Sequence, residues 1–162
     1  MGARPELICC AGGNPTFAHA AVEAGRLYGA RLPATVYEQV YFADQDWKKP
    51  DRQCYMAALA EHRPTMATVL DYESEEQLPE VRAWGEEAAQ WVERVVIIAK
   101  VPGRVGDIPE RIGNAEVILG FSVPTSYGGT TCGTWEFGRR SVHLLGGSPQ
   151  KQMEMAGYLN VV

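Results

Sequence analysis

The sequence predicts an α/β fold in which a parallel sheet of about six or seven strands is joined by crossover helices. Short apolar runs recur along the chain, each followed by a polar or glycine-rich cluster and then a helical pattern. The runs are apolar at both odd and even positions, which is typical of strands buried on both faces. No linker or low-complexity tract interrupts this alternation, so we expect residues 1–162 to form a single α/β domain. Periodicity alone leaves two architectures open, an open doubly wound sheet or most of a barrel.

The first half of the chain carries three of the expected strands, at 7–11, 36–42 and 67–70. Asn14 followed by Pro15 is a typical helix start, with a capping side chain and then a proline suited to the first helical position. We expect that helix to cover about 16–28 and to end before Gly29. The next helices are expected at 51–62 and 78–92, the second because its apolar residues form one stripe.

The second half repeats the pattern with strands at 95–99, 117–121 and 142–145. A short helix is expected near 108–112, and a long loop from 122 to about 133. Ser148 and Pro149 repeat the cap-and-proline start, which predicts a last helix over about 149–159. Val161 and Val162 have the apolar character of a seventh strand.

Composition and charge exclude several classes of protein. Hydrophobic residues make up 46% and charged residues 22% of the chain, as in ordinary globular domains. A net charge of −5 disfavours a broadly basic surface, although a local patch for DNA or tRNA stays open. The longest apolar run, 95–99, is too short to cross a bilayer, and the N-terminus has no apolar signal region. We therefore expect a cytoplasmic protein with no membrane partner. Cys9 and Cys10 are expected to be reduced core residues.

Candidate functional residues follow the predicted strands, because both architectures bind ligands at the carboxyl ends of their strands. Three carboxylates are the candidate catalytic groups, since clustered carboxylates perturb each other's pKa and so favour one acid and one base. They are Asp44, Asp46 and Asp71. Other rim residues are candidate substrate contacts: Glu73, Lys100, Gly103, Ser122, His143, Gly146 and Gly147.

Several of these residues have an alternative structural interpretation. Asp44 and Asp46 could be turn formers, and Glu73 could belong to a solvated acidic helix start. His143 lies inside a predicted strand, where a core histidine with satisfied hydrogen bonds is the simpler explanation. Asp71 differs, because it directly follows a buried strand where a carboxylate without a partner is unfavourable. A functional role is therefore favoured for Asp71.

The order of the rim motifs resembles the tRNA-guanine transglycosylase superfamily, especially its phage and bacterial relatives linked to 7-deazaguanine modification of DNA. Segment 42–47 is similar to the place of the family's first aspartate, and 68–73 to the strand whose aspartate recognises the base. Segment 100–103 stands where the family often has a Val-Gln-Gly turn. Segment 117–122 resembles the following glycine-rich strand, and 143–149 the family's Leu-(Met/Leu)-Gly-x-Gly-x-Pro strand and helix start.

This resemblance implies a partial TIM-barrel-like fold and exchange of guanine for a 7-deazaguanine-type base through a covalent nucleotide intermediate. The chain departs from the family pattern in three ways. The usual Asp-Ser-Gly context of the first aspartate is Asp44-Gln45-Asp46 here, and the Cys-x-Cys-x-x-Cys zinc site is absent from the sequence. The family nucleophile lies on a strand that would begin near Val161, so the motif assigns that role to no residue.

Three functions follow from these residues. The first is a nucleobase transferase or N-glycosidase that needs no cofactor, in which Asp71 binds a guanine-type edge and Asp44 or Asp46 acts as base. A nucleophile would then come from a second chain, or water would attack directly. The second is a non-catalytic module that binds a base or nucleotide. The third is a Mg²⁺-dependent phosphohydrolase that uses the rim carboxylates as oxygen ligands. Because a partial barrel exposes a strand edge, we also expect a homodimer or a sheet edge covered by 122–140.

Overall fold

The computed structural model describes residues 5–10 and 12–162, so Ala11 and residues 1–4 lie outside the described residues. The strands are β1 Ile8–Cys10, β2 Leu27–Arg31, β3 Phe42–Asp44, β4 Met66–Thr68, β5 Arg94–Ile98, β6 Arg111–Ile112, β7 Ala115–Ser122 and β8 Val142–Leu145. The α-helices are α1 Pro15–Glu23, α2 Arg52–His62, α3 Leu78–Ala88 and α4 Pro149–Ala156. Three 3₁₀ turns complete the elements: η1 Glu75–Gln77, η2 Val105–Asp107 and η3 Thr134–Phe137.

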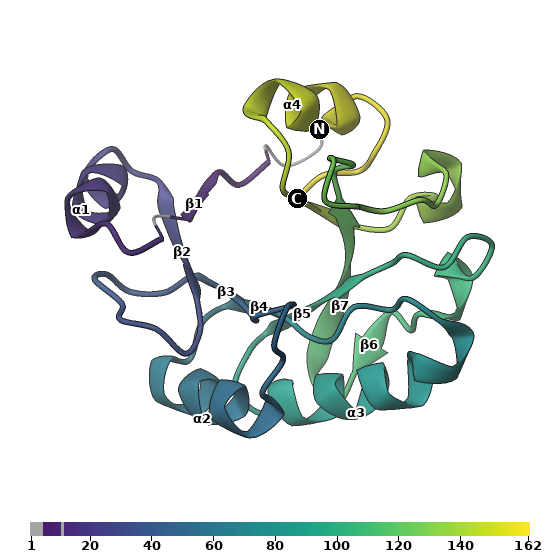
Figure 1. The fold of residues 1–162 in the computed structure, drawn as a ribbon, viewed down its shortest axis with the longest axis horizontal. Coiled ribbons are helices and arrows are strands. Elements are labelled where there is room, and N and C mark those ends of the chain that lie inside the picture. The colour runs from purple at the N-terminus through teal and green to yellow at the C-terminus, as the bar shows by residue number, and fades with distance from the viewer. Residues whose placement is uncertain (1–4, 11) are drawn as a thin grey trace.

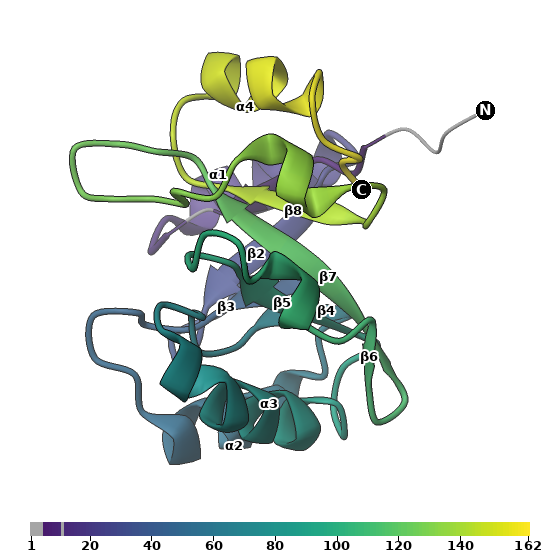
Figure 2. The same ribbon diagram turned by 90° about the vertical axis from the view of Figure 1, so that its right-hand side faces the viewer.

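The strands form one mostly parallel sheet that curls into a half-barrel, with the four α-helices on its outer side (Figure 1). Parallel pairing runs in the order β1-β2-β3-β4-β5-β7-β8, and β6 joins β7 as an antiparallel hairpin. Val161 makes a parallel bridge to Val142, which confirms strand-like pairing at the expected seventh strand. A side view places α4 on the flank of the half-barrel opposite α2 and α3 (Figure 2). The predicted α/β class with a parallel sheet and crossover helices is confirmed.

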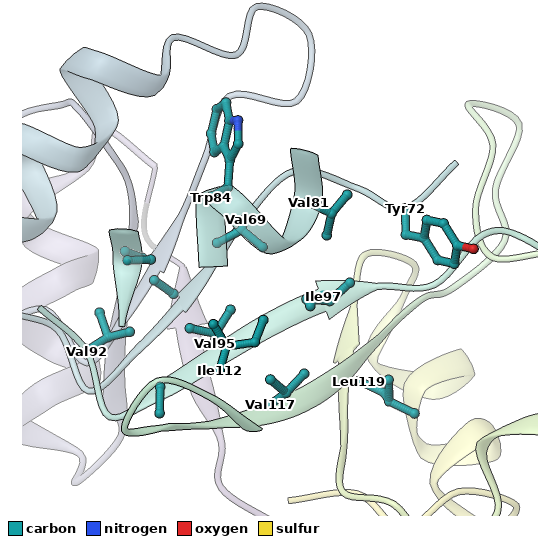
Figure 3. Packing of buried hydrophobic residues seen from close by; sticks show 14 of the residues in the cluster. Val69, Tyr72, Val81, Trp84, Val92, Val95, Ile97, Ile112, Val117 and Leu119 are labelled. Atoms are coloured by element: carbon teal, nitrogen blue, oxygen red, sulfur yellow. The ribbon is translucent and has the colours of Figure 1, made fainter. Parts of the chain in front are cut away.

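The convex face of the sheet holds the main hydrophobic core. Val95 and Ile97 of β5 project from this face, and Val81 and Trp84 of α3 belong to the same buried cluster (Figure 3). All four side chains are at most 4% exposed. Burial of this kind contributes roughly 25 cal/mol for each Å² of apolar surface, which makes the helix-covered face the main source of stability.

The concave face carries a second, smaller apolar cluster. It consists of Phe42, Met66, Val96 and Ile118, one from each of four neighbouring strands and each at most 2% exposed. The His143 ring stacks against Phe42 with ring centroids 4.7 Å apart. Because successive strand residues alternate between faces, Asp44 lies on the same concave face as Phe42.

The predicted helix starts are confirmed by their capping bonds. Asn14 Oδ1 accepts the backbone N–H of Phe17 at 3.1 Å at the start of α1. Ser148 Oγ accepts the N–H of Lys151 at 3.3 Å at the start of α4. These caps satisfy backbone donors that the first turn of a helix leaves free.

Four element predictions are wrong, and a local backbone feature explains the early end of α1. Helix α1 ends at Glu23 instead of near 28, because Gly25 adopts a left-handed φ of 72° that stops the helix. The chain then forms β2, which was not expected. The strand expected at 36–42 begins only at Phe42, and the helix expected at 108–112 is replaced by the β6 strand of a short hairpin.

Among the residues that the structure describes, no helix combines the length and the apolar character that a membrane span requires.

Candidate functional site

A cavity of about 220 Å³ opens at the carboxyl ends of five strands, from β3 to β8 around the half-barrel. This volume is below the roughly 300–1,000 Å³ typical of drug-sized ligand pockets, so it suits a single flat ring system. Its lining combines acidic, amide, basic, aromatic and glycine residues: Asp44, Gln45, Trp47, Asp71, Ile98, Lys100, Ser122, Val123, Thr125, Tyr127, Gly128, Gly129, Leu145 and Gly146.

The end of β3 is fixed by hydrogen bonds to β4. The Thr68 hydroxyl donates to Asp44 Oδ1 at 2.8 Å, and the backbone N–H of Gln45 donates to Thr68 Oγ1 at 3.0 Å. Beneath them the buried Tyr55 hydroxyl of α2 lies 2.8 Å from Thr68 O and 3.2 Å from Ala43 O. Asp44 is therefore held in one orientation at the cavity.

Pairing beyond the end of β4 brings a lysine between two carboxylates. Tyr72 makes an isolated parallel bridge to Ala99, and strand alternation then directs Asp71, Glu73 and Lys100 to the same side. Lys100 Nζ lies 2.7 Å from Asp71 Oδ2 and 2.8 Å from Glu73 Oε1. The side chains of Asp71 and Lys100 are only 12% and 21% exposed, so this pair is poorly screened by water.

Burial sets the protonation of these groups. It raises the pKa of Asp44 above its usual range, and the nearby Asp71 raises it further, against the lowering effect of the Thr68 hydroxyl. Burial also raises the pKa of Asp71, although the Lys100 ammonium opposes this. For Lys100, burial works against the charged form, but the bonds to Asp71 and Glu73 outweigh it and raise the pKa. The cavity therefore holds a persistent cation next to two carboxyls that ionise less readily than usual.

Two buried oxygen atoms at the cavity have no hydrogen-bond partner within residues 5–10 and 12–162. They are Asp71 Oδ1 and Gln45 Oε1, and the whole Gln45 residue is only 3% exposed. Leaving a buried acceptor unpaired costs about 1–3 kcal/mol. Both residues line the cavity, but the two oxygen atoms themselves have almost no accessible surface, so a ligand N–H reaches them only when side chains at the cavity shift.

Two exposed aromatic rings flank the cavity mouth. Trp47 follows β3 and is 52% exposed, with Lys48 Nζ 5.3 Å from the centre of its ring. Tyr127 is 90% exposed at the tip of a turn in which Thr125 and Gly128 exchange backbone hydrogen bonds. Gly129 completes this turn with a φ of 150°, and a Cβ there would lie 2.6 Å from Pro124 Cα, so only glycine fits.

The structure brings together Asp44, Asp71, Lys100, Ser122 and Gly146 at the cavity, with Glu73 attached through Lys100. The remaining candidates lie apart from it. Asp46 lines a neighbouring depression and accepts the N–H of Lys48 at 3.1 Å, as a turn former does. The N–H of Gly103 donates to Glu136, Gly147 packs against Val123, and His143 is buried on the concave face.

Comparison with known proteins identifies one family. A model described as a family of unknown function, DUF6610, matches residues 21–162. The chain belongs to this family. No curated protein and no solved structure matches the chain. The matched segment includes every residue that lines the cavity, so the site is part of the family's own domain.

Three polar or aromatic cavity residues, Gln45, Trp47 and Tyr127, were not selected from the sequence, and neither was Thr68, which orients Asp44. Trp47 could have been recognised from the sequence as a candidate ligand contact, because it is a large aromatic residue in a polar loop directly after a strand end. Gln45 and Thr68 could not have been recognised in this way, since an amide or hydroxyl at a strand end is as often structural as functional. Tyr127 lies in a long loop whose path only the folded chain defines.

Within the described part of the chain, no group of three or more His, Cys, Asp and Glu side chains is arranged to hold a metal ion.

Proposed function

We propose that this chain is a nucleobase-handling protein with guanine/7-deazaguanine transglycosylase-like or N-glycosidase activity. The observation that carries the proposal is the pair of buried, unpartnered acceptors, Asp71 Oδ1 and Gln45 Oε1, in a small cavity beside Asp44. A ligand that supplies several N–H donors along one flat edge would satisfy them together. The amidine edge of a guanine-type base has this form.

The exposed rings at the mouth support a planar ligand. Trp47 and Tyr127 line the same cavity as the carboxylates, and stacking on an aromatic side chain contributes about 1–3 kcal/mol per base. Lys48 lies over the Trp47 ring and adds positive charge next to it. A DNA or tRNA strand that carries the target base could use this local patch, in spite of the acidic net charge.

The carboxylates suit displacement of a base at C1′ of the sugar. When the bond from C1′ to the base nitrogen breaks, its electron pair leaves with the base and positive charge develops on C1′ and the ring oxygen. The Asp44 carboxylate stabilises that charge and accepts a proton from an attacking water in hydrolysis. In exchange, the incoming base gives up an N–H proton and the outgoing base gains one. Burial raises the pKa of Asp44, which brings this base nearer to neutral pH.

The half-barrel fits a partial TIM-barrel-like fold better than a flat doubly wound sheet, because its strands curl around one axis with the helices outside. The proposed site lies where barrel enzymes hold theirs, at the carboxyl ends of the strands. Barrel closure and any nucleophile would come from a second copy of the chain in a homodimer.

The direct test is an exchange assay. The full chain is incubated with DNA or tRNA and radiolabelled guanine or a 7-deazaguanine, and label in the polymer is counted. We expect incorporation, or release of free base if water is the acceptor, and loss of both in Asp71→Asn. Saturable binding of a base without turnover would instead identify a binding module. Neither binding nor turnover would refute the proposal.

A further inference from the structure

We propose that Lys100 is a specificity-determining residue that selects bases with a 6-oxo group and an adjacent N1–H over bases with a 6-amino group. This inference rests on the proposed function and specifies the substrate class of the same site. The ammonium of Lys100 pairs with one oxygen of Asp71 and leaves the other oxygen without a partner.

The two oxygen atoms of Asp71 have different partners. Oδ2 accepts from Lys100 Nζ at 2.7 Å, whereas Oδ1 is buried and has no partner. Once a shift of the lining side chains exposes Oδ1, a ligand N–H can bind it without displacing the lysine, because Lys100 holds the other oxygen. The same ligand then meets the ammonium directly beside the carboxylate.

Lys100 has a hydrogen atom left for such a ligand. The ammonium carries three N–H donors, and two of them are used by Asp71 and by Glu73, which lies 2.8 Å away. No third acceptor among the described residues is bonded to Nζ. Because Lys100 lines the cavity, its remaining donor is available to a ligand acceptor there.

Glu73 is a positioning residue in this arrangement. Its side chain is 56% exposed and holds Nζ from the solvent side, while Asp71, at 12% exposure, holds it from the buried side. Two anions fix the ammonium where a single pair would leave a flexible lysine side chain mobile. The pair also keeps the ammonium charged, so that it can donate but never accept.

A donor beside an acceptor is complementary to only one of the two purine types. A 6-oxo base offers the C6 carbonyl as acceptor and N1–H as donor, which match Lys100 and Asp71 Oδ1. A 6-amino base offers the reverse, an amino donor and a bare N1 acceptor. The amino group would face an ammonium that cannot accept, and N1 would face a carboxylate oxygen. Sites built on hydrogen bonds reject such mismatched ligands strongly, so we expect at least about 100-fold discrimination.

Guanine and 2,6-diaminopurine are the probes for the test, because both carry the 2-amino group and they differ only at the C6 and N1 edge. Calorimetric titration of the full chain measures the dissociation constant of each. We expect wild-type protein to bind guanine at least about 100-fold more tightly than 2,6-diaminopurine. In Lys100→Gln the ratio should fall to about tenfold or less, since a glutamine amide can rotate to accept or to donate. Lys151→Gln is the matched control, an exposed lysine on α4 that does not line the cavity and whose loss should leave the ratio unchanged.

The outcomes separate the two proposals. If the wild-type protein binds neither base, the proposed function fails and this inference fails with it. If it binds both bases equally, or if Lys100→Gln keeps the wild-type ratio, only the inference about Lys100 is overturned. Thermal unfolding establishes that the variant is folded. Should Lys100→Gln not fold, Glu73→Gln, which frees the ammonium on its exposed side, is expected to lower the ratio, and an unchanged ratio there overturns the inference.

Discussion

The two ends of the sheet both carry clusters of charged and polar side chains. Within residues 5–10 and 12–162, the cluster at the carboxyl ends contains buried acceptors without a partner, whereas the cluster at the amino ends does not. At the amino ends, Arg94 donates to Tyr41 Oη at 3.2 Å and to Glu6 at 3.4 Å, and the Tyr41 hydroxyl donates to Glu6 at 2.5 Å. At the carboxyl ends, Asp71 Oδ1 and Gln45 Oε1 are buried without a partner. The first cluster connects the N-terminal segment to the sheet, whereas the second has two acceptors left for the ligand that we propose.

We therefore expect the paired cluster at the amino ends to affect stability, and the unpaired acceptors at the carboxyl ends to affect ligand binding. Groups that bond only to one another contribute to the folded state alone, and their replacement should change stability. Unpaired buried acceptors destabilise the free protein. They are retained at sites where a ligand supplies the missing hydrogen bonds. Substitutions at the two ends should therefore have opposite signatures.

The largest contrast is expected between Asp71→Asn and Arg94→Met. An asparagine amide would present an N–H to the ligand's own N–H donors, so base exchange should fall about 10³-fold. Lys100 keeps Glu73 as a partner in this variant, so the change in stability should be much smaller than the change in activity. Arg94→Met should keep the exchange rate and destabilise the protein by about 1 kcal/mol, because the Arg94 and Glu6 side chains are partly exposed. Exchange kinetics and urea unfolding of both variants measure the contrast. Equal losses of activity would abolish the distinction between the two ends.

A second contrast concerns His143, which lies between the two ends on the concave face. Burial lowers its pKa to about 4, so the unfolded chain takes up a proton first as the pH falls below 6.5. The stability contributed by the neutral ring is present above pH 6.5 and lost as the pH falls through 4. This loss amounts to roughly 3 kcal/mol.

His143→Phe should remove that loss while keeping a ring against Phe42. Urea unfolding of both proteins at pH 7.5 and pH 4.5 measures the effect. The wild type should lose more stability than the variant on acidification. Parallel losses in the two proteins would mean that His143 is not the group responsible.

A smaller effect is expected at the mouth of the cavity. Trp47→Ala should weaken base binding about tenfold, because one stacking surface is lost. Trp135→Ala is the matched control, since Trp135 is 83% exposed on η3 and does not line the cavity. Fluorescence titration with a base or short oligonucleotide measures both. A similar loss in the control would indicate a general effect of surface tryptophans.

Asp44→Asn is expected to have the smallest effect on stability, opposite in sign to its effect on function. The buried carboxyl has a raised pKa, so ionising it as the pH rises destabilises the folded state. Asparagine can still accept the Thr68 hydroxyl, so the variant should be more stable than the wild type at pH 8, with a smaller gain at pH 5. Base exchange should be lost. A stability loss at pH 8 would show that Asp44 acts as a structural anion.

Particular elements show where sequence reasoning succeeded. The strands β5, β7 and β8 were expected within about three residues of their bounds. Each is a continuous apolar run, and such a run is stable only when it is buried in the sheet. Strand β2 was missed because Gly25 ends α1 early. A single glycine is also tolerated inside a helix, so the sequence did not predict the left-handed conformation that Gly25 adopts. Asp71 and Lys100 were selected at the rim, but their contact was not predicted.

The sequence by itself determined the α/β class, the caps of α1 and α4, and the presence of carboxylates after buried strands. These properties depend on local conformational preference and on burial, which neighbouring residues specify. Only the tertiary structure decided that Asp44 and Asp71 face one cavity while Asp46 does not, and that Lys100 lies between Asp71 and Glu73. Those relations depend on strand order, register and loop path, which are set by packing between residues far apart in the chain.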